Sequence, residues 1–165
     1  KSVTAYIPDN PDLYEHLSGI EYLNFIADVY GVPAKEKETR IAKYADLFEI
    51  TGSLGSLIGS YSHGMKQKAA LIGALIHEPK LLVLDEPFVG LDPKSALDLK
   101  NIMRELCQKG SSIFFSTHVL EVAEKLCNKV AIIKNGELVA NGPIKEVLGN
   151  ESLESVFMEV TEHEK

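Results

Sequence analysis

The 165-residue sequence predicts an α/β protein with a parallel sheet and an additional helical segment. Leu81 to Leu84 is a continuous apolar run that ends in Asp85, Glu86 and Pro87, which is typical of a strand covered on both faces, as in parallel sheets. Residues 80–149 alternate between β-rich and helical segments, whereas residues 13–77 carry apolar side chains at helical spacing. A chain of this length can bury a substantial core as one domain.

The first half of the chain is predicted to contain one short strand and three helices. Pro8 ends the strand, and Ser18 with Glu21 forms a capping box that begins the first helix. The expected elements are a strand at residues 3–7, helices at residues 18–31, at residues 34–48 and from Ser62 to before Pro79, and a Gly- and Ser-rich loop at residues 51–60.

The second half is predicted to alternate between strands and helices. Asp92 as N-cap, with Pro93 at the first helical position, begins a helix that ends near Gly110. Asn135-Gly136 predicts a tight hairpin turn. The other expected elements are strands at 112–117, 130–134 and 137–140, a helix at 118–127, a short helix begun by Gly142-Pro143 and a final helix capped by Ser152.

Charge and composition exclude several classes of protein. The formal net charge is −7, and no cluster of Lys and Arg outweighs the local acids, which argues against a nucleic-acid partner. No apolar run reaches membrane-spanning length. The 2 cysteines fit reduced thiols of a cytosolic protein better than a disulfide framework or a metal site.

Three polar groups have residue types and positions suited to phosphate chemistry. Asp85 and Glu86 follow a buried strand, where one acid can hold Mg²⁺ and its neighbour can orient a water. Ser62 and Gly64 lie where a helix begins, and its amides and dipole favour an anion. His118 follows another apolar strand, so it would lie at the same sheet edge. Taken singly, these features also fit an acidic turn, an ordinary N-cap and a structural histidine.

The order and spacing of these motifs resemble those of the ATP-binding cassette (ABC) family. Its signature motif, Walker B strand, D-loop and switch histidine correspond to Ser62–Met65, Leu81–Glu86, Gly90–Asp92 and His118, and Ala5–Asp9 is similar to its Q-loop. The resemblance covers nearly the whole chain. It implies part of a three-layer RecA-like P-loop NTPase fold with a parallel sheet, divided into a Q-loop strand (1–12), a helical subdomain (13–79), the core (80–149) and a C-terminal helix (150–165).

The resemblance also implies roles for individual residues, with ATP and Mg²⁺ as cofactors. Asp85 would contact Mg²⁺ through water, as would Asp9, and Glu86 would orient or deprotonate the attacking water. His118 would contact the γ-phosphate, and Asp92 would communicate across a dimer. Four signature residues would bind the ATP of the opposite subunit, namely Ser62, His63, Gly64 and Met65.

Three departures from the family pattern affect this assignment. Asp9 replaces the Q-loop Gln, as an acid does in related exporters, and His63 and Met65 replace a Gly and the Gln of the signature. A P-loop needs G-x-x-x-x-G-K-[ST]. Gly59 to Gly64 is the nearest segment, but Met65 follows where Lys is required. The chain therefore looks like the carboxyl-terminal two-thirds of a cassette domain, inactive by itself.

The expected function is a piece of the ATPase subunit of an exporter at the cytoplasmic face of the cell membrane. The implied partners are a transmembrane permease and a second nucleotide-binding domain, without nucleic acid. Two alternatives stay open: a non-transport cassette ATPase of translation or DNA repair, and an inactive binding module.

Overall fold

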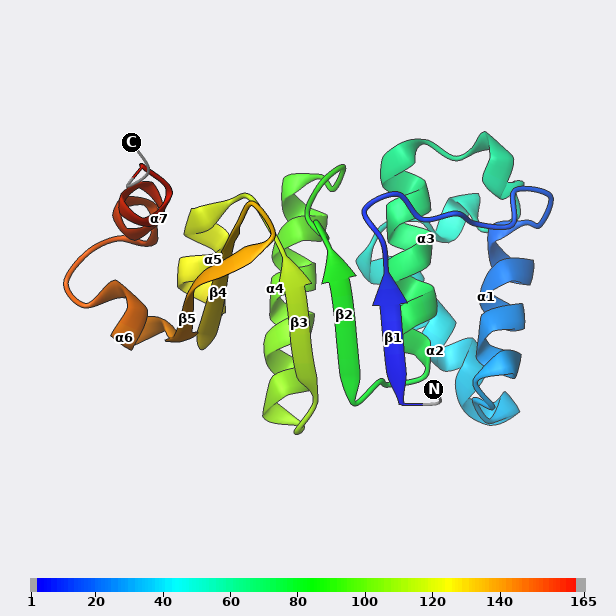
Figure 1. Cartoon of the computed structure of the whole chain (residues 1–165). Helices are drawn as coiled ribbons and strands as arrows, with labels where there is room; N and C mark the ends of the chain where they lie inside the picture. The colour runs from blue at the N-terminus through cyan, green and yellow to red at the C-terminus, as the bar shows by residue number, and fades with distance from the viewer. Residues whose placement is uncertain (1–2, 163–165) are drawn as a thin grey trace. The chain divides into compact units, whose positions relative to one another are not determined.

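The computed structural model describes residues 3–162 and divides after Ser116 into two compact units. Figure 1 shows the elements of both. The first unit contains β1 (Thr4–Ile7), α1 (Gly19–Val29), α2 (Ala34–Leu47), two 3-10 helices (Thr51–Ser53 and Ile58–Ser60), α3 (His63–Ile76), β2 (Leu81–Asp85), α4 (Pro93–Gln108) and β3 (Ser112–Ser116).

The strands of the first unit form a parallel sheet in the order β1-β2-β3, which confirms the predicted fold class. Ile7 pairs with Leu84, and Asp85 pairs with Ser116. Because the strands are parallel and paired to their ends, all three carboxyl ends lie at one edge. Figure 1 shows that α3 and α4 begin at this same edge.

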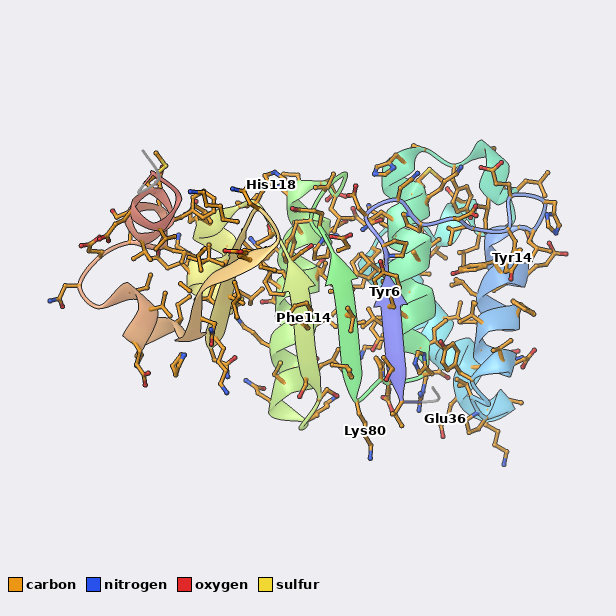
Figure 2. All side chains as sticks on the ribbon, in the orientation of Figure 1. Tyr6, Tyr14, Glu36, Lys80, Phe114 and His118 are labelled. Atoms are coloured by element: carbon orange, nitrogen blue, oxygen red, sulfur yellow. The ribbon has the colours of Figure 1, made fainter. Side chains whose placement is uncertain are left out.

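The two faces of this sheet differ in burial. The helices α3 and α4 lie on one face, where Ile7, Leu82 and Leu84 are buried. The opposite face carries the paired row Tyr6, Val83 and Phe114, of which Tyr6 is 62% exposed and Phe114 is 64% exposed (Figure 2). The expectation that β2 is covered on both faces is therefore wrong for the described residues, because alternate positions of β2 face a surface without a helix.

The helical part of the first unit packs around α3. Both α1 and α2 contact α3, whose residues from Ala69 to Ile76 are all buried. The predicted capping box at the start of α1 is present, with the Ser18 amide donating to Glu21 Oε2 at 2.8 Å. A helix buried on this many sides needs apolar residues around its whole circumference, which accounts for the run of Ala, Leu and Ile in α3.

Over residues 117–162, the described part of the second unit, the elements are α5 (Leu120–Leu126), β4 (Lys129–Lys134), β5 (Glu137–Pro143), α6 (Ile144–Leu148) and α7 (Leu153–Glu162), with β4 and β5 forming a hairpin. Asn135 and Gly136 have φ of 52° and 82°, as the predicted tight turn requires. The buried core of this unit consists of Ala123, Ile132, Leu153 and Val156.

Three predicted boundaries are wrong. The expected loop at 51–60 contains the two 3-10 helices, and β5 continues through Gly142-Pro143 because these residues pair with Val130 and Lys129. The helix expected from His118 begins at Leu120, since Thr117 Oγ accepts the Val119 amide at 3.1 Å and turns the chain first. The division into segments ending at residues 12, 79 and 149 stays a prediction.

Candidate functional site

The carboxyl edge of the sheet gathers the end of each strand of the first unit. Asp9 lies two residues beyond the end of β1, whereas Asp85 ends β2 and Glu86 follows it. Ser116 ends β3, beside Asp85 in the register. This edge is the usual ligand side of an open α/β sheet.

Ser116 connects the two acids through one hydroxyl. Its Oγ donates a hydrogen bond to Asp85 Oδ1 and accepts one from the Glu86 amide at 3.2 Å. Glu86 has a φ of 45°, in the left-handed region that L-residues seldom adopt. From the sequence, no role was assigned to Ser116. The signal for one was its position as a polar residue at the carboxyl end of an apolar strand.

Asp85 has an oxygen suited to a magnesium-bound water. Its Oδ2 makes no hydrogen bond to residues 3–162, whereas Oδ1 is engaged by Ser116. No group of three or more His, Cys, Asp or Glu side chains gathers to hold a metal directly in this range. Mg²⁺ keeps several waters and takes only one or two carboxylates alongside substrate phosphates, so the residues present fit it.

The first turn of α3 presents backbone amides at the same edge. Ser62 is its N-cap, and its Oγ accepts the Met65 amide at 3.3 Å. Ser62 and His63 are exposed, and Gly64 and Met65 are half-buried. The amides of such a turn and the helix dipole favour an anion. The cap accounts for Ser62 structurally, and its nucleotide contact stays a prediction.

The turn before α4 packs directly on the start of α3. A Cβ added to Gly64 would lie 2.6 Å from the carbonyl oxygen of Gly90. Gly90 has a φ of 78°, and a Cβ there would lie 2.7 Å from His63 Cδ2. The structure therefore brings the residues predicted as signature motif and D-loop into contact, and two glycines make this approach possible.

Asp92 is held by its own chain. It caps α4 by accepting the Ser95 amide at 2.9 Å, and its Oδ2 lies 2.7 Å from Lys68 Nζ in α3. The Lys68 ammonium and, after it, the Ser95 donors hold the pKa of this carboxyl far below its usual range. Asp92 thus links α3 to α4, and its role across a dimer stays a prediction.

His118 belongs to the second unit, directly after Thr117. Its proximity to Asp85 therefore stays a prediction. Among residues 3–162 no helix is both long enough and apolar enough to cross a membrane.

Comparisons with known sequences and structures found similar proteins. Residues 5–124 match a family model described as an AAA domain, putative AbiEii toxin, Type IV TA system. The chain is 37% identical to an uncharacterized ABC transporter ATP-binding protein of Nostoc sp. over 92% of this chain and 46% of that protein. It is 34% identical to the ABC-type transporter ATP-binding protein EcsA of Bacillus subtilis, over 99% of this chain and 68% of EcsA.

A solved structure described as the ATP-binding subunit of an ABC transporter superposes with a TM-score of 0.93 at 36% identity. The match covers 97% of this chain and 69% of that chain. The present chain spans about half the length of the first two curated relatives, at 46% and 47%. With its AAA-type domain match, its parallel sheet and its relatives, the chain belongs to the family of ABC transporter ATP-binding proteins.

Proposed function

We propose that the chain is part of the ATP-hydrolysing subunit of an ABC exporter. The observation that carries the proposal is that Asp85, Glu86 and Ser116 meet at one edge of the sheet. The helices α3 and α4 begin at the same edge (Figure 1). Phosphoryl transfer depends on positioning and on neutralising charge around an in-line attack. Acids at a sheet edge, beside exposed helix amides, supply groups of that kind.

Each residue has a task in this proposal. Asp85 and Asp9 would contact Mg²⁺ through water, and Glu86 would orient or deprotonate the attacking water. His118 donates to the γ-phosphate, and the signature residues Ser62 to Met65 bind the nucleotide of a second subunit. Mg²⁺, when bound, neutralises the phosphate oxygens. Asp92 transmits the state of one site to the other.

The open sheet face supports the proposal that a further part of the protein supplies the phosphate-binding loop. Parallel sheets are covered on both faces, whereas Tyr6 and Phe114 are largely exposed. The 165 residues contain no G-x-x-x-x-G-K-[ST] motif. A strand, loop and helix from outside this chain would cover the face and complete the site.

An exposed aromatic cluster supports a membrane partner for the helical segment. Tyr14 and Phe25 pack edge to face with their centroids 5.6 Å apart, and they are 49% and 44% exposed. Aromatic side chains that stay exposed are enriched where another protein binds. In this proposal a transmembrane permease docks here, at the cytoplasmic face of the membrane, ATP closes a dimer of nucleotide-binding domains, and hydrolysis reopens it.

Magnesium-dependent ATP turnover by a longer protein that contains this chain tests the proposal. Glu86→Gln keeps the side-chain size and removes the base, so we expect turnover to fall by about a hundredfold or more. Glu146→Gln, at an exposed position of α6, is the matched control and keeps its turnover. Full turnover with Glu86→Gln would contradict the assignment.

Identifying the molecules that copurify with the longer protein distinguishes a transporter subunit from the alternative functions. A membrane subunit is the expected result. Ribosomes or DNA would instead indicate a cassette ATPase of translation or repair, and turnover absent even from the longer wild-type protein would indicate a binding module.

A further inference from the structure

We infer that Ser116 is a positioning residue that sets the side chain of Asp85 and the backbone of Glu86 through a single hydroxyl. The inference rests on the proposed function, because it assigns a part to a residue that touches both proposed acids. Ser116 itself has no contact with the reacting atoms in this assignment.

The hydrogen bonds of Ser116 run in one direction. A serine hydroxyl has one proton to donate, and here the proton goes to Asp85 Oδ1, so its lone pair is left to accept the Glu86 amide at 3.2 Å. Each bond in such a chain polarises the next. The amide of Glu86, the hydroxyl and the Asp85 carboxylate therefore form one connected unit across two strands.

The backbone of Glu86 needs this support. A φ of 45° is strained for an L-residue, and strained backbone persists where surrounding contacts hold it. On one side the Glu86 carbonyl accepts the Val89 amide at 3.1 Å. On the other side the Glu86 amide is held by Ser116. Loss of the hydroxyl would remove the contact on the Glu86 amide and let the strained backbone relax, which would displace the side chain of Glu86.

The same hydroxyl selects the oxygen that Asp85 presents. With Oδ1 engaged by Ser116, the carboxylate is fixed in rotation, and Oδ2 is the oxygen left for a magnesium-bound water. A carboxylate without this bond is free to rotate. The expected consequence is a loss in the chemical step rather than in nucleotide affinity, because the proposed function takes the phosphate-binding loop of this site from outside this chain.

The first experiment compares three substitutions in the longer protein. Ser116→Ala is expected to lower kcat by about tenfold to a hundredfold, as small misplacements of reacting groups do, while KM for MgATP changes less than about twofold. Ser116→Thr keeps the hydroxyl and is expected to restore most of kcat. Ser112→Ala, at the other end of β3 on the same exposed face, is the matched control and keeps wild-type kinetics.

The second experiment uses the present chain and needs no activity. Amide hydrogen exchange at Glu86, followed by NMR, is expected to be faster in Ser116→Ala than in wild type and Ser116→Thr, whereas the Leu84 amide exchanges as before. This readout reports the contact itself. A general loss of stability would speed exchange at both amides.

Two results would overturn the inference. One is an unchanged kcat in Ser116→Ala in a protein that Glu86→Gln inactivates, and the other is an unchanged Glu86 exchange rate. Failure of the proposed function looks different, because Glu86→Gln then retains turnover while the exchange result still shows whether Ser116 holds Glu86.

Discussion

Two glycines determine how closely the start of α3 approaches the turn before α4. Gly64 lies against the carbonyl of Gly90, and Gly90 adopts a φ that favours glycine. A side chain at either position would push apart the backbone segments that carry the proposed signature and D-loop. Single residues therefore control whether these two motifs touch.

Gly64→Ala is expected to destabilise the protein by about 1–3 kcal/mol, the usual cost of overpacking a close contact. The added methyl meets backbone, which cannot move aside as a flexible side chain can. Gly55→Ala is the control, since a Cβ there meets no atom within 4 Å. Urea unfolding measures both variants, and equal stability of the two would contradict the contact.

Stability is also expected to fall at mildly acidic pH because of His77. Its ring stacks on Tyr30 with centroids 3.8 Å apart. Burial lowers the pKa of His77 below its ordinary value of 6.5, the Gly73 backbone partly opposes this shift, and the nearby Arg40 adds to it. As the pH falls below about 6.5, His77 of the unfolded chain takes up a proton while His77 of the folded chain stays neutral. The free energy of unfolding is therefore unaffected by His77 above that pH and decreases as the pH falls towards the folded pKa.

Unfolding by urea between about pH 7.5 and about pH 5.5 tests this dependence, because the range spans the ordinary His pKa. His77→Phe keeps an aromatic ring beside Tyr30 and is expected to lose less stability over the range than wild type. His16→Gln, at an exposed position, should behave as wild type. The same pH dependence in wild type and His77→Phe would contradict the prediction.

At the scale of elements, α3 and α4 are tied together where both begin. Asp92 caps α4 and pairs with Lys68 of α3, six residues beyond the Ser62 cap. The cap was predictable from Asp92-Pro93, a local pattern. The ion pair was not, because it depends on how two helices separated by β2 pack.

Asp92→Ala is expected to cost about 1 kcal/mol of stability, the usual value for loss of an N-cap. Asp92→Asn keeps an acceptor for the Ser95 amide and loses only the charge pair with Lys68, so it should cost less. Chemical denaturation of the two variants measures the difference. A larger loss in Asp92→Asn than in Asp92→Ala would contradict the assignment of the cap as the main contribution.

At the scale of the whole molecule, the open face of the three-stranded sheet is the surface most prone to association. Its exposed aromatic residues lie in one paired row, and β1 and β3 are the outer strands of this sheet. Exposed apolar faces and unpaired strand edges promote association. This face of the sheet is therefore suited to packing against another layer of protein.

We therefore expect the chain to self-associate in solution, as light scattering would show. Replacing both Tyr6 and Phe114 by Lys places charge on this face and should shift the chain towards monomer. Val29→Lys is the control, because Val29 is 62% exposed on α1, away from the sheet. A monomeric wild-type chain would contradict this prediction.

The chain alone is also expected to lack measurable ATPase activity and to bind MgATP only weakly. The cradle of successive amides and a Lys that holds phosphates in a P-loop is not encoded in these 165 residues. Titration calorimetry tests the affinity, and a micromolar Kd would contradict the prediction.

The sequence predicted most elements because their signals are local. The capping box at Ser18, the Asn135-Gly136 turn and the Asp92-Pro93 start each involve residues within a few positions of one another. The end of β5 was misjudged because Gly142-Pro143 looks like a helix start locally, while its pairing with β4 depends on a partner strand.

By itself, the sequence determined the element order, the parallel sheet and the choice of Asp85, Glu86 and Ser62 as candidate site residues. Only the tertiary structure decided the Gly64–Gly90 contact, the hydroxyl of Ser116 between two acids and the open sheet face. The reason is physical: periodicity and capping act within a few residues, whereas these features arise from register and packing between segments far apart in the chain.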